Sequence, residues 1–432
     1  MTIGLASLAK NFGVSSRARS RWIPLVAALG AWSACFVGVA PSAIAEEAPT
    51  KQWYLEPMQA QKMWDVSTGE GITVAVIDSG VNPSTDALDG QVLPGIDKSQ
   101  TGRPGDAHHD YLGHGTTMAE LIAGTGKNGS VQGLAPGVKI LPIRIEMREG
   151  EPGNIEFGKS YSADAIRAAA DSEAQIINMS FGSGLGGGAS TAEAIEYAES
   201  KGKIMFAASG NEREEEGGED NYNFPAGFAE VASVGALNRS NEVASFSSSG
   251  KVDLTAPGVD LPGWCNESFT GYCIEEGTSH ATALASASAA LIWAEHPDWT
   301  ANQVLRVMIE TTGKPIGNGG RKSKYLGYGV IRPREVLLEG KGDPGDPDQH
   351  PLMKAKADDP EESSDPGEEH DPEETPAPDG ELDAGDDGAA DKVAVAEPGS
   401  GDRMPVGLLI GAGGAVVVVV AGAIVFATRR RA

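Results

Sequence analysis

Short, almost uninterrupted apolar runs, separated by helix-forming segments, are the feature that most limits how this chain can fold. Four runs have the length and composition of buried strands: ITVAVI from residue 72, KILPIRI from 139, AQIINMSF from 174 and KIMFAAS from 203. Segments with helical periodicity, such as SADAIRAAADSEA and STAEAIEYAESKG, lie between several of them. Strands that are buried on both faces and alternate with helices form parallel sheets. The sequence therefore predicts an α/β domain whose mostly parallel central sheet is covered by helices on both faces.

Four polar residues stand where these elements end or begin. Asp78 follows the first run, Asn211 follows the fourth in AASGNE, and His114 and Ser279 open helical patterns in GHGT and GTSHAT. Function collects at the carboxyl ends of strands in such sheets. Each residue alone could be a cap or a turn residue, but the order Asp, His, Ser fits a nucleophilic triad. Adjacent residues on a helix do not face each other, so His280 is not expected to be the base for Ser279.

The motifs AVIDSGV, GHGT, AASGN and GTSHAT, in this order, resemble those of the subtilases over about residues 60–340. The resemblance implies a subtilisin-like three-layer fold and a serine endopeptidase that acts on protein or peptide substrates. In it, Ser279 would be the nucleophile, His114 its base, and Asp78 the carboxylate that orients His114. Asn211 and the backbone N–H of Ser279 would donate hydrogen bonds to the oxyanion.

The resemblance also implies where the substrate lies. An extended peptide would pair with the backbone of Ser180, Phe181 and Gly182. One departure from the family pattern is Ala283, which stands where the family usually has a proline, so the start of that helix is expected to differ in detail. Subtilases often bind calcium, but no loop has a convincing spacing of oxygen ligands. No metal-binding residue and no cofactor is therefore predicted.

Both ends of the chain have the composition of membrane-targeting segments. Residues 1–45 show the basic, apolar and small-residue order of a secretory signal peptide, with an uncleaved anchor as the alternative. Residues 404–428 are long and apolar enough for a transmembrane helix, and the basic tail at 429–432 is expected to be cytoplasmic. A cell-wall sorting signal would need a Leu-Pro-x-Thr-Gly motif, which GSGDRMPVGLL lacks. The catalytic domain is therefore predicted to be extracellular, on a single-pass membrane protein.

Charge separates a linker from the domain and excludes one class of partner. The net charge is −27, and residues 341–403 are acidic, rich in Pro and Gly and poor in aromatic residues, which predicts a disordered linker. So acidic a chain should repel nucleic acid. The acidic stretch EREEEGGEDN after Asn211 could favour basic substrates, but a solvated loop is the preferred interpretation.

Cysteine usage fits an oxidising compartment. Cys35 lies in the predicted signal peptide, which leaves Cys265 and Cys273 as an even pair. We expect these two to form one disulfide that closes a short loop. A metal site is not expected there, because no further His or Cys lies nearby.

The predicted order of segments is a signal peptide, a leader at 46–70, a catalytic domain at 71–340, the linker, a membrane helix and a basic tail. The leader is too short for an independent propeptide domain and is expected to pack along the catalytic domain. This order resembles that of the mycosins, membrane-anchored subtilases associated with type VII secretion, whose partners would be secretion-channel components or secreted substrates. The alternatives are a mainly structural part of a secretion complex and a general scavenging protease.

Overall fold

The computed structural model describes residues 52–99, 104–145, 161–182, 188–213, 223–314 and 322–353, all within one compact unit of the chain. The predicted signal peptide, membrane helix and basic tail lie outside these ranges, as does the linker after residue 353. Among the described residues, no helix has the length and apolar character needed to cross a membrane.

A seven-stranded sheet forms the centre of the described domain, and all of its strand pairs are parallel. The strand order is β2-β3-β1-β4-β5-β6-β7. The strands are β1 Thr73–Asp78, β2 Ile96–Asp97, β3 Lys139–Arg144, β4 Ile176–Met179, β5 Ile204–Ala208, β6 Ala232–Leu237 and β7 Leu254–Pro257. The four apolar runs of the sequence are β1, β3, β4 and β5, so the predicted parallel α/β sheet is confirmed.

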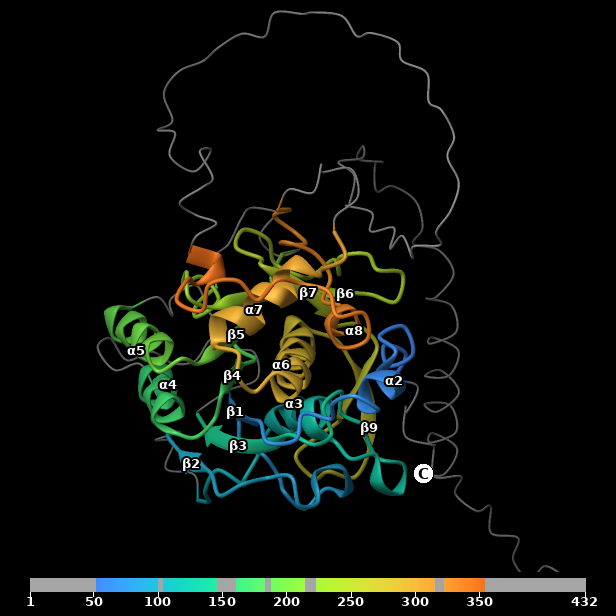
Figure 1. Ribbon diagram of the computed structural model, residues 1–432. Coiled ribbons are helices and arrows are strands. Elements are labelled where there is room, and N and C mark those ends of the chain that lie inside the picture. Colours follow the sequence, from blue (N-terminus) through green and yellow to red (C-terminus); the bar gives the residue numbers. More distant parts are fainter. Residues whose placement is uncertain are drawn as a thin grey trace, which may run out of the picture. The chain divides into compact units, whose positions relative to one another are not determined.

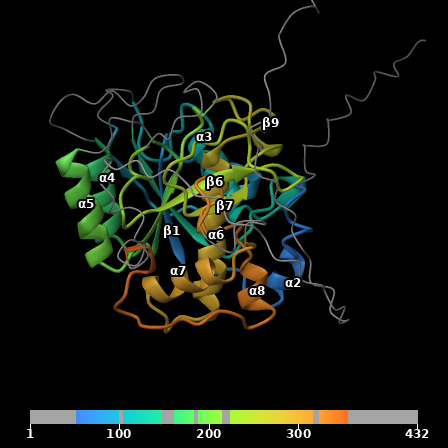
Figure 2. The ribbon, with the colours of Figure 1, turned by 90° about the horizontal axis from the view of Figure 1, so that it is seen from above.

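Helices cover both faces of this sheet (Figures 1 and 2). The helices α4 Tyr161–Asp171 and α5 Ala189–Ser200 lie on one side, and α3 His114–Ala123 and α6 Thr278–Glu295 on the other. The alternation of side chains along β1 shows why, because Ala75 and Ile77 join the core under α4 and α5 while Val74 and Val76 join the core under α3 and α6. The expected three-layer arrangement is therefore present.

The central helix α6 explains the run of small residues in its sequence. Its residues from Thr278 to Trp293 are all buried, and it contacts the strands β4, β5, β6 and β7 as well as α3. Alanine and serine let a helix approach its neighbours closely on every side. The smaller helices around it are α2 Ala60–Trp64, α7 Ala301–Glu310, α8 Pro333–Leu337 and the 3₁₀ turns η1 Asp86–Leu88 and η2 Lys127–Gly129.

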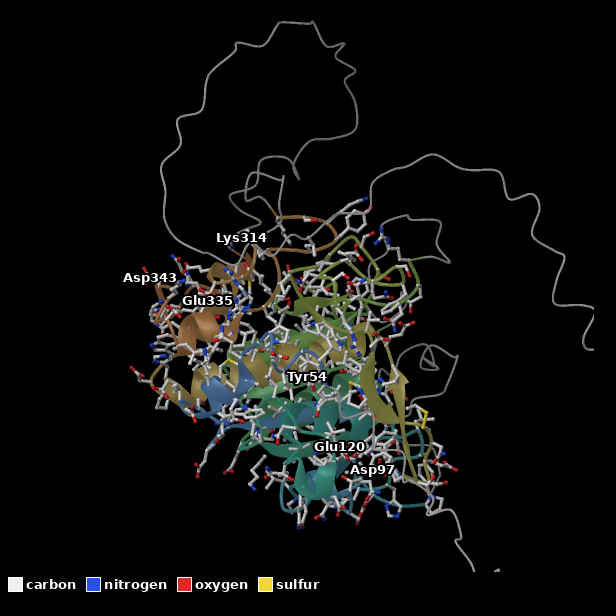
Figure 3. All side chains as sticks on the ribbon, turned by 90° about the vertical axis from the view of Figure 1, so that its right-hand side faces the viewer. Tyr54, Asp97, Glu120, Lys314, Glu335 and Asp343 are labelled. Atoms are coloured by element: carbon white, nitrogen blue, oxygen red, sulfur yellow. A yellow bond between two sulfur atoms is a disulfide. The ribbon has the colours of Figure 1, made fainter. Side chains whose placement is uncertain are left out.

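An antiparallel hairpin lies against α3, outside the main sheet. It consists of β8 Leu261–Trp264 and β9 Tyr272–Glu275. Cys265 and Cys273 are joined by a disulfide across it, as predicted, and a yellow bond marks this disulfide in Figure 3. The Trp264 N–H donates to Thr117 Oγ1 (3.0 Å), and the Tyr272 hydroxyl donates to Glu120 Oε2 (2.7 Å). The hairpin is thus fixed to the helix that begins with His114.

The segment just before β1 packs against the domain. Tyr54 is fully buried, and Figure 3 shows it deep among the side chains. The Trp64 indole N–H donates to the Leu134 carbonyl (2.8 Å), and the Ser67 hydroxyl donates to the Leu291 carbonyl on α6 (2.7 Å). These contacts attach the described part of the leader to the loop before β3 and to α6.

The domain extends beyond the boundary at residue 340 that the sequence predicts. Leu352 is buried, and residues 343–349 lie along α7. Arg306 Nη2 donates to the carbonyls of Asp346 (3.0 Å) and Gln349 (2.6 Å), and Asn302 donates to the Pro347 carbonyl (2.9 Å). Composition alone predicts a linker in this stretch. Its contacts are made mainly by backbone carbonyls, which every residue type has, so composition does not reveal them.

Candidate active site

The strand order brings the predicted polar residues to one edge of the sheet. The strands β2 and β3 lie on one side of β1, and β4 to β7 lie on the other. The direction in which the chain adds strands to the sheet therefore reverses between β1 and β4. Sites in open parallel sheets lie outside the carboxyl ends of the strands at such a reversal. Asp78 is the last residue of β1, Ser180 directly follows β4, and Asn211 follows β5 by three positions.

Asp78 and His114 form a hydrogen-bonded pair. His114 Nδ1 lies 2.8 Å from Asp78 Oδ1, and Asp78 is completely buried whereas 27% of the His114 side chain is exposed. The same Asp78 oxygen accepts the Ser79 N–H at 2.8 Å. With Nδ1 directed at the carboxylate, Nε2 of His114 is the nitrogen left for a substrate or nucleophile.

The environment favours the charged form of His114. Burial by itself lowers the pKa of this imidazole, but the charge and hydrogen bond of Asp78 outweigh burial and raise the pKa to about 9. Asp110 and Glu275 add to the increase through their negative charges. Neutral His114, which can accept a proton, therefore becomes more abundant as the pH rises through this range.

Two glycines allow His114 to stand at the start of α3. Gly113 has a φ of 79°, a conformation that strongly favours glycine. A Cβ on Gly115 would lie 2.1 Å from the Gly80 carbonyl oxygen and 3.0 Å from the Asp78 Cβ, so only glycine lets the helix approach the end of β1. The two glycines of the GHG motif thus allow the His114 imidazole to contact the Asp78 carboxylate.

Asp110 is a site residue that the sequence analysis missed. Its Oδ1 accepts the Gly113 N–H (2.9 Å), and its Oδ2 accepts the N–H (2.8 Å) and hydroxyl (2.6 Å) of Thr116. It therefore satisfies donors in the first turn of α3 and adds negative charge near His114. An Asp four positions before the histidine is a capping signal, but nothing in the sequence connects it to Ser79, whose hydroxyl lies 2.8 Å from Asp110 Oδ1.

Ser279 lies in the first turn of α6, almost buried, and α6 packs against α3. Its hydroxyl donates to the carbonyl of Ser180 at 2.9 Å. In return, the Ser180 hydroxyl donates to the carbonyl of Ser279 at 3.0 Å. The two serines therefore link the nucleophile candidate to the end of β4, and the Ser279 hydroxyl has to turn away from Ser180 before it can transfer a proton to His114.

This link continues into the core through Asn178, a second residue that the sequence analysis did not identify. The Asn178 side-chain amide donates to the Ser180 hydroxyl (2.9 Å) and accepts from the Ser286 hydroxyl on α6 (2.9 Å). All of these residues are buried. Asn178 is the only polar side chain inside β4, and such an interruption of an apolar strand could have indicated a positioning role.

Asn211 presents its side-chain nitrogen to the site. Its Oδ1 accepts both the N–H and the hydroxyl of Thr278, each at 2.9 Å. Because two donors fix the oxygen, the amide nitrogen points the other way. A Cβ on Gly277 would lie 3.5 Å from Asn211 Nδ2 and 3.7 Å from the Ser279 nitrogen. The two nitrogens therefore lie near the same position, which makes both of them candidate donors to an oxyanion.

The remaining predicted residues have separate environments. Ser180 is buried and turned toward α6, Phe181 packs partly against the core under α4 and α5, and Gly182 is exposed. Ala283 lies within α6, which continues without a break from Thr278 to Glu295. Within the described ranges, no three His, Cys, Asp or Glu side chains are arranged to hold a metal ion.

Known proteins share sequence and fold with this chain. Residues 69–329 match the model of the subtilase family, Peptidase_S8. The chain is 34% identical over 269 residues to subtilisin E from Bacillus subtilis and 36% identical over 271 residues to a thermophilic serine proteinase from a Bacillus species. These matches cover 61% of this chain in both cases, but only 65% and 61% of the two relatives.

Among solved structures, the fold is similar to MycP1 from Mycobacterium smegmatis, with a TM-score of 0.57 and 26% identity. The match covers 69% of this chain and 86% of that structure. The MycP3 protease from the type VII (ESX-3) secretion system is also similar, with a TM-score of 0.55 and 27% identity over 66% of this chain and 87% of that one.

Proposed function

The chain belongs to the subtilase family, and from that premise we propose that it is a serine endopeptidase whose triad is Asp78, His114 and Ser279. The observation that supports this most directly is the 2.8 Å hydrogen bond between His114 Nδ1 and the buried Asp78 carboxylate. It fixes the imidazole with Nε2 free, on the helix that packs against the one bearing Ser279.

In the proposed reaction, the Ser279 hydroxyl leaves the Ser180 carbonyl and attacks the carbonyl carbon of the substrate. Its proton passes to His114 Nε2, and Asp78 stabilises the resulting imidazolium. Asn211 Nδ2 and the Ser279 N–H bind the oxyanion of the tetrahedral intermediate. When the C–N bond breaks, His114 gives the proton to the leaving amine, and water then hydrolyses the acyl-enzyme by the same steps in reverse.

A serine-reactive fluorophosphonate tests this proposal without knowledge of the substrate. The full chain should react at one residue, and Ser279→Ala should abolish the labelling. Ser288→Ala, which removes another buried hydroxyl of α6, is the matched control and should leave labelling intact. Properly folded wild type that does not react would exclude the proposed chemistry.

We further propose a mycosin-like role in type VII secretion, with the catalytic domain on the extracellular side of the membrane. The supporting observation is the similarity to MycP1 and MycP3, together with the packing of residues 52–67 on the domain. The proposed organisation is a signal peptide at 1–45, a leader to about residue 70, a catalytic domain to residue 353, an acidic linker, a membrane helix at 404–428 and a basic tail.

The proposed processing protease and two alternatives, a mainly structural component and a general scavenging protease, make different predictions in the cell. A mainly structural component would support secretion equally well as wild type and as Ser279→Ala, whereas a deletion of the whole chain would not. A processing protease would release products with wild type that are missing with Ser279→Ala, and proteomics of the secreted fraction would identify them. A general scavenging protease would efficiently degrade unfolded casein, which we do not expect.

A further inference from the structure

His280, next to the proposed nucleophile, is a buried imidazole that the mechanism above does not use. Its side chain is only 4% exposed. Both ring nitrogens are buried, and neither makes a hydrogen bond within the described part of the chain. A buried polar group without a partner is costly and calls for an explanation. The two nitrogens face different surroundings, and each one indicates part of that explanation.

The Nδ1 atom lies close to the two proposed oxyanion donors. A Cβ built on Gly277 would lie 3.4 Å from His280 Nδ1, 3.5 Å from Asn211 Nδ2 and 3.7 Å from the Ser279 nitrogen. Three nitrogens from three residues therefore lie within 4 Å of the position that a Cβ at residue 277 would take. Two of them, Asn211 Nδ2 and the Ser279 nitrogen, are N–H donors, and the third is His280 Nδ1, which has no hydrogen-bond partner in the described part of the chain.

The Nε2 atom faces a carboxylate on the opposite edge of the ring. It lies 3.4 Å from Glu275 Oε2, in an ion-pair contact that is not aligned well enough for a hydrogen bond. Glu275 ends β9, and the opposite strand leaves room for it, since a Cβ on Gly263 would lie 2.0 Å from Glu275 Oε2. The hairpin that the disulfide closes thus places the Glu275 carboxylate next to the His280 imidazole.

We propose that His280 is a third donor to the oxyanion, through Nδ1–H, while Glu275 accepts from Nε2–H and holds the ring. The inference rests on the proposed function, because an oxyanion forms at Ser279 only if the chain is a serine hydrolase. Glu275 and His280 would then form a second carboxylate–imidazole pair, which acts on the oxygen of the tetrahedral intermediate while Asp78 and His114 act on the hydroxyl of Ser279.

The charges around the ring determine when this donor is available. Burial lowers the pKa of His280, Glu275 and Asp78 act in the opposite direction, and the nearby His114 adds to the lowering. Burial therefore disfavours the charged form of the ring in the free protein. When the oxyanion forms, negative charge lies on both edges of the ring, and the ring takes up one proton from solvent water. The proton of the Ser279 hydroxyl still goes to His114, so the two imidazoles receive different protons.

Two isosteric substitutions separate the nitrogens. His280→Asn keeps an N–H donor near the place of Nδ1, whereas His280→Gln keeps one only near the place of Nε2. With a fluorophosphonate, Ser279 forms an O–P bond, fluoride leaves, and the phosphoryl oxygen occupies the oxyanion space. The second-order labelling rate of His280→Gln should fall about 10- to 100-fold, as for a lost hydrogen bond to a charged group. His280→Asn should stay within about threefold of wild type.

Equal labelling rates for wild type and a folded His280→Gln variant would overturn the inference and leave the proposed function intact. If wild type itself does not react, both are wrong. Glu275→Gln adds a second comparison, because the effects of Glu275→Gln and His280→Gln should be smaller in combination than their separate effects multiplied. Rates that multiply would show that the two residues act independently.

A measurement on the unmutated chain does not depend on how the variants fold. Histidine labelled with ¹⁵N reports by NMR which ring nitrogens bear a proton. In the phosphonylated protein, both nitrogens of His280 should be protonated, and Nδ1 should show the shift of a hydrogen-bonded donor. An Nδ1 that remains unprotonated in this adduct would exclude it as a donor to the oxyanion.

Discussion

The hydroxyl of Ser279 donates its hydrogen bond to the carbonyl of Ser180, at 2.9 Å, and the hydroxyl of Ser180 returns one to the carbonyl of Ser279. This reciprocal pair fixes the first turn of α6 relative to the end of β4. The nucleophile candidate is therefore positioned through backbone carbonyls before any substrate is bound.

Removing the Ser180 hydroxyl should lower kcat more than it changes KM. Ser180→Ala takes away the bond to the Ser279 carbonyl and leaves the Asn178 amide without its acceptor. We expect a loss of about 1–3 kcal/mol in the free energy of unfolding. Ser288→Ala is the control, because that hydroxyl donates only within α6, to Leu284. Denaturant titration and steady-state kinetics measure the two effects, and an unchanged kcat in Ser180→Ala would contradict the positioning role.

The Asp78–His114 pair predicts a shifted pH profile. The pKa of His114 is raised to about 9, chiefly because Asp78 outweighs the effect of burial. The neutral base predominates only above its pKa, so kcat/KM should rise with pH to about 9. Asp78→Asn removes the charge, so the acid limb should move to lower pH while kcat falls by about 10⁴-fold. Rates measured between pH 5 and 10 test this, and an acid limb that does not move would contradict it.

Asn211 should contribute to the transition state and little to substrate binding. Asn211→Ala is expected to lower kcat by about 100- to 1000-fold with KM almost unchanged. Thr278→Val removes one of the two donors that orient the Asn211 amide and should lower kcat by roughly tenfold. A larger loss in Thr278→Val than in Asn211→Ala would place the important contact on Thr278 instead.

Asp253 should contribute to the acid sensitivity of the fold. Burial opposes its ionisation, but Lys251 and Lys322 outweigh this and lower its pKa from 3.8 to about 2. A lowered carboxyl pKa stabilises the folded state above the unfolded value and loses that effect as the pH falls toward 2. We expect a loss of about 2 kcal/mol between pH 4 and pH 2, which Asp253→Asn should abolish. Asp89→Asn, at an exposed pair with Lys127, should have little effect on the same pH titration of unfolding.

Glu120 should act in the opposite sense. Burial raises the pKa of this carboxyl from 4.5 to about 7, and the hydrogen bond from the Tyr272 hydroxyl counteracts only part of the effect. The folded state then holds a proton that the unfolded state has released, so stability falls as the pH rises from about 4.5 to 7, by about 3 kcal/mol. Glu120→Gln should flatten this decline, whereas the exposed Glu196→Gln should leave it unchanged. Unfolding curves measured at several pH values would show both.

The strands β1, β3, β4 and β5 could be predicted from the sequence because each is an almost uninterrupted apolar run, whereas β6 and β7 were not predicted. The short strand β2 has no such signal, and the hairpin depends on the partner strand and on the disulfide rather than on its own residues. The end of the domain was predicted too early, at residue 340, because acidic and proline-rich composition outweighed a single buried Leu352 and contacts made by backbone carbonyls.

The site was predictable to the extent that its groups sit in recognisable local contexts. Asp78, His114 and Asn211 follow strands or begin a helix, and the structure brings Asp78 and His114 into contact. Asp110, Asn178 and Glu275 were not identified, because their contacts with Ser79, Ser286 and the ring of His280 form only when separate elements pack together. Their roles depend on packing between elements, which local sequence patterns do not specify.

The segment along α7 also determines how the domain responds to tension. Force applied to the chain after residue 353 reaches the fold at Leu352 and at the carbonyls that bind Arg306 and Asn302. These bonds connect the segment to α7, which contains none of the proposed catalytic residues. A pull on the chain beyond residue 353 would therefore act first on the contacts between residues 343–353 and α7.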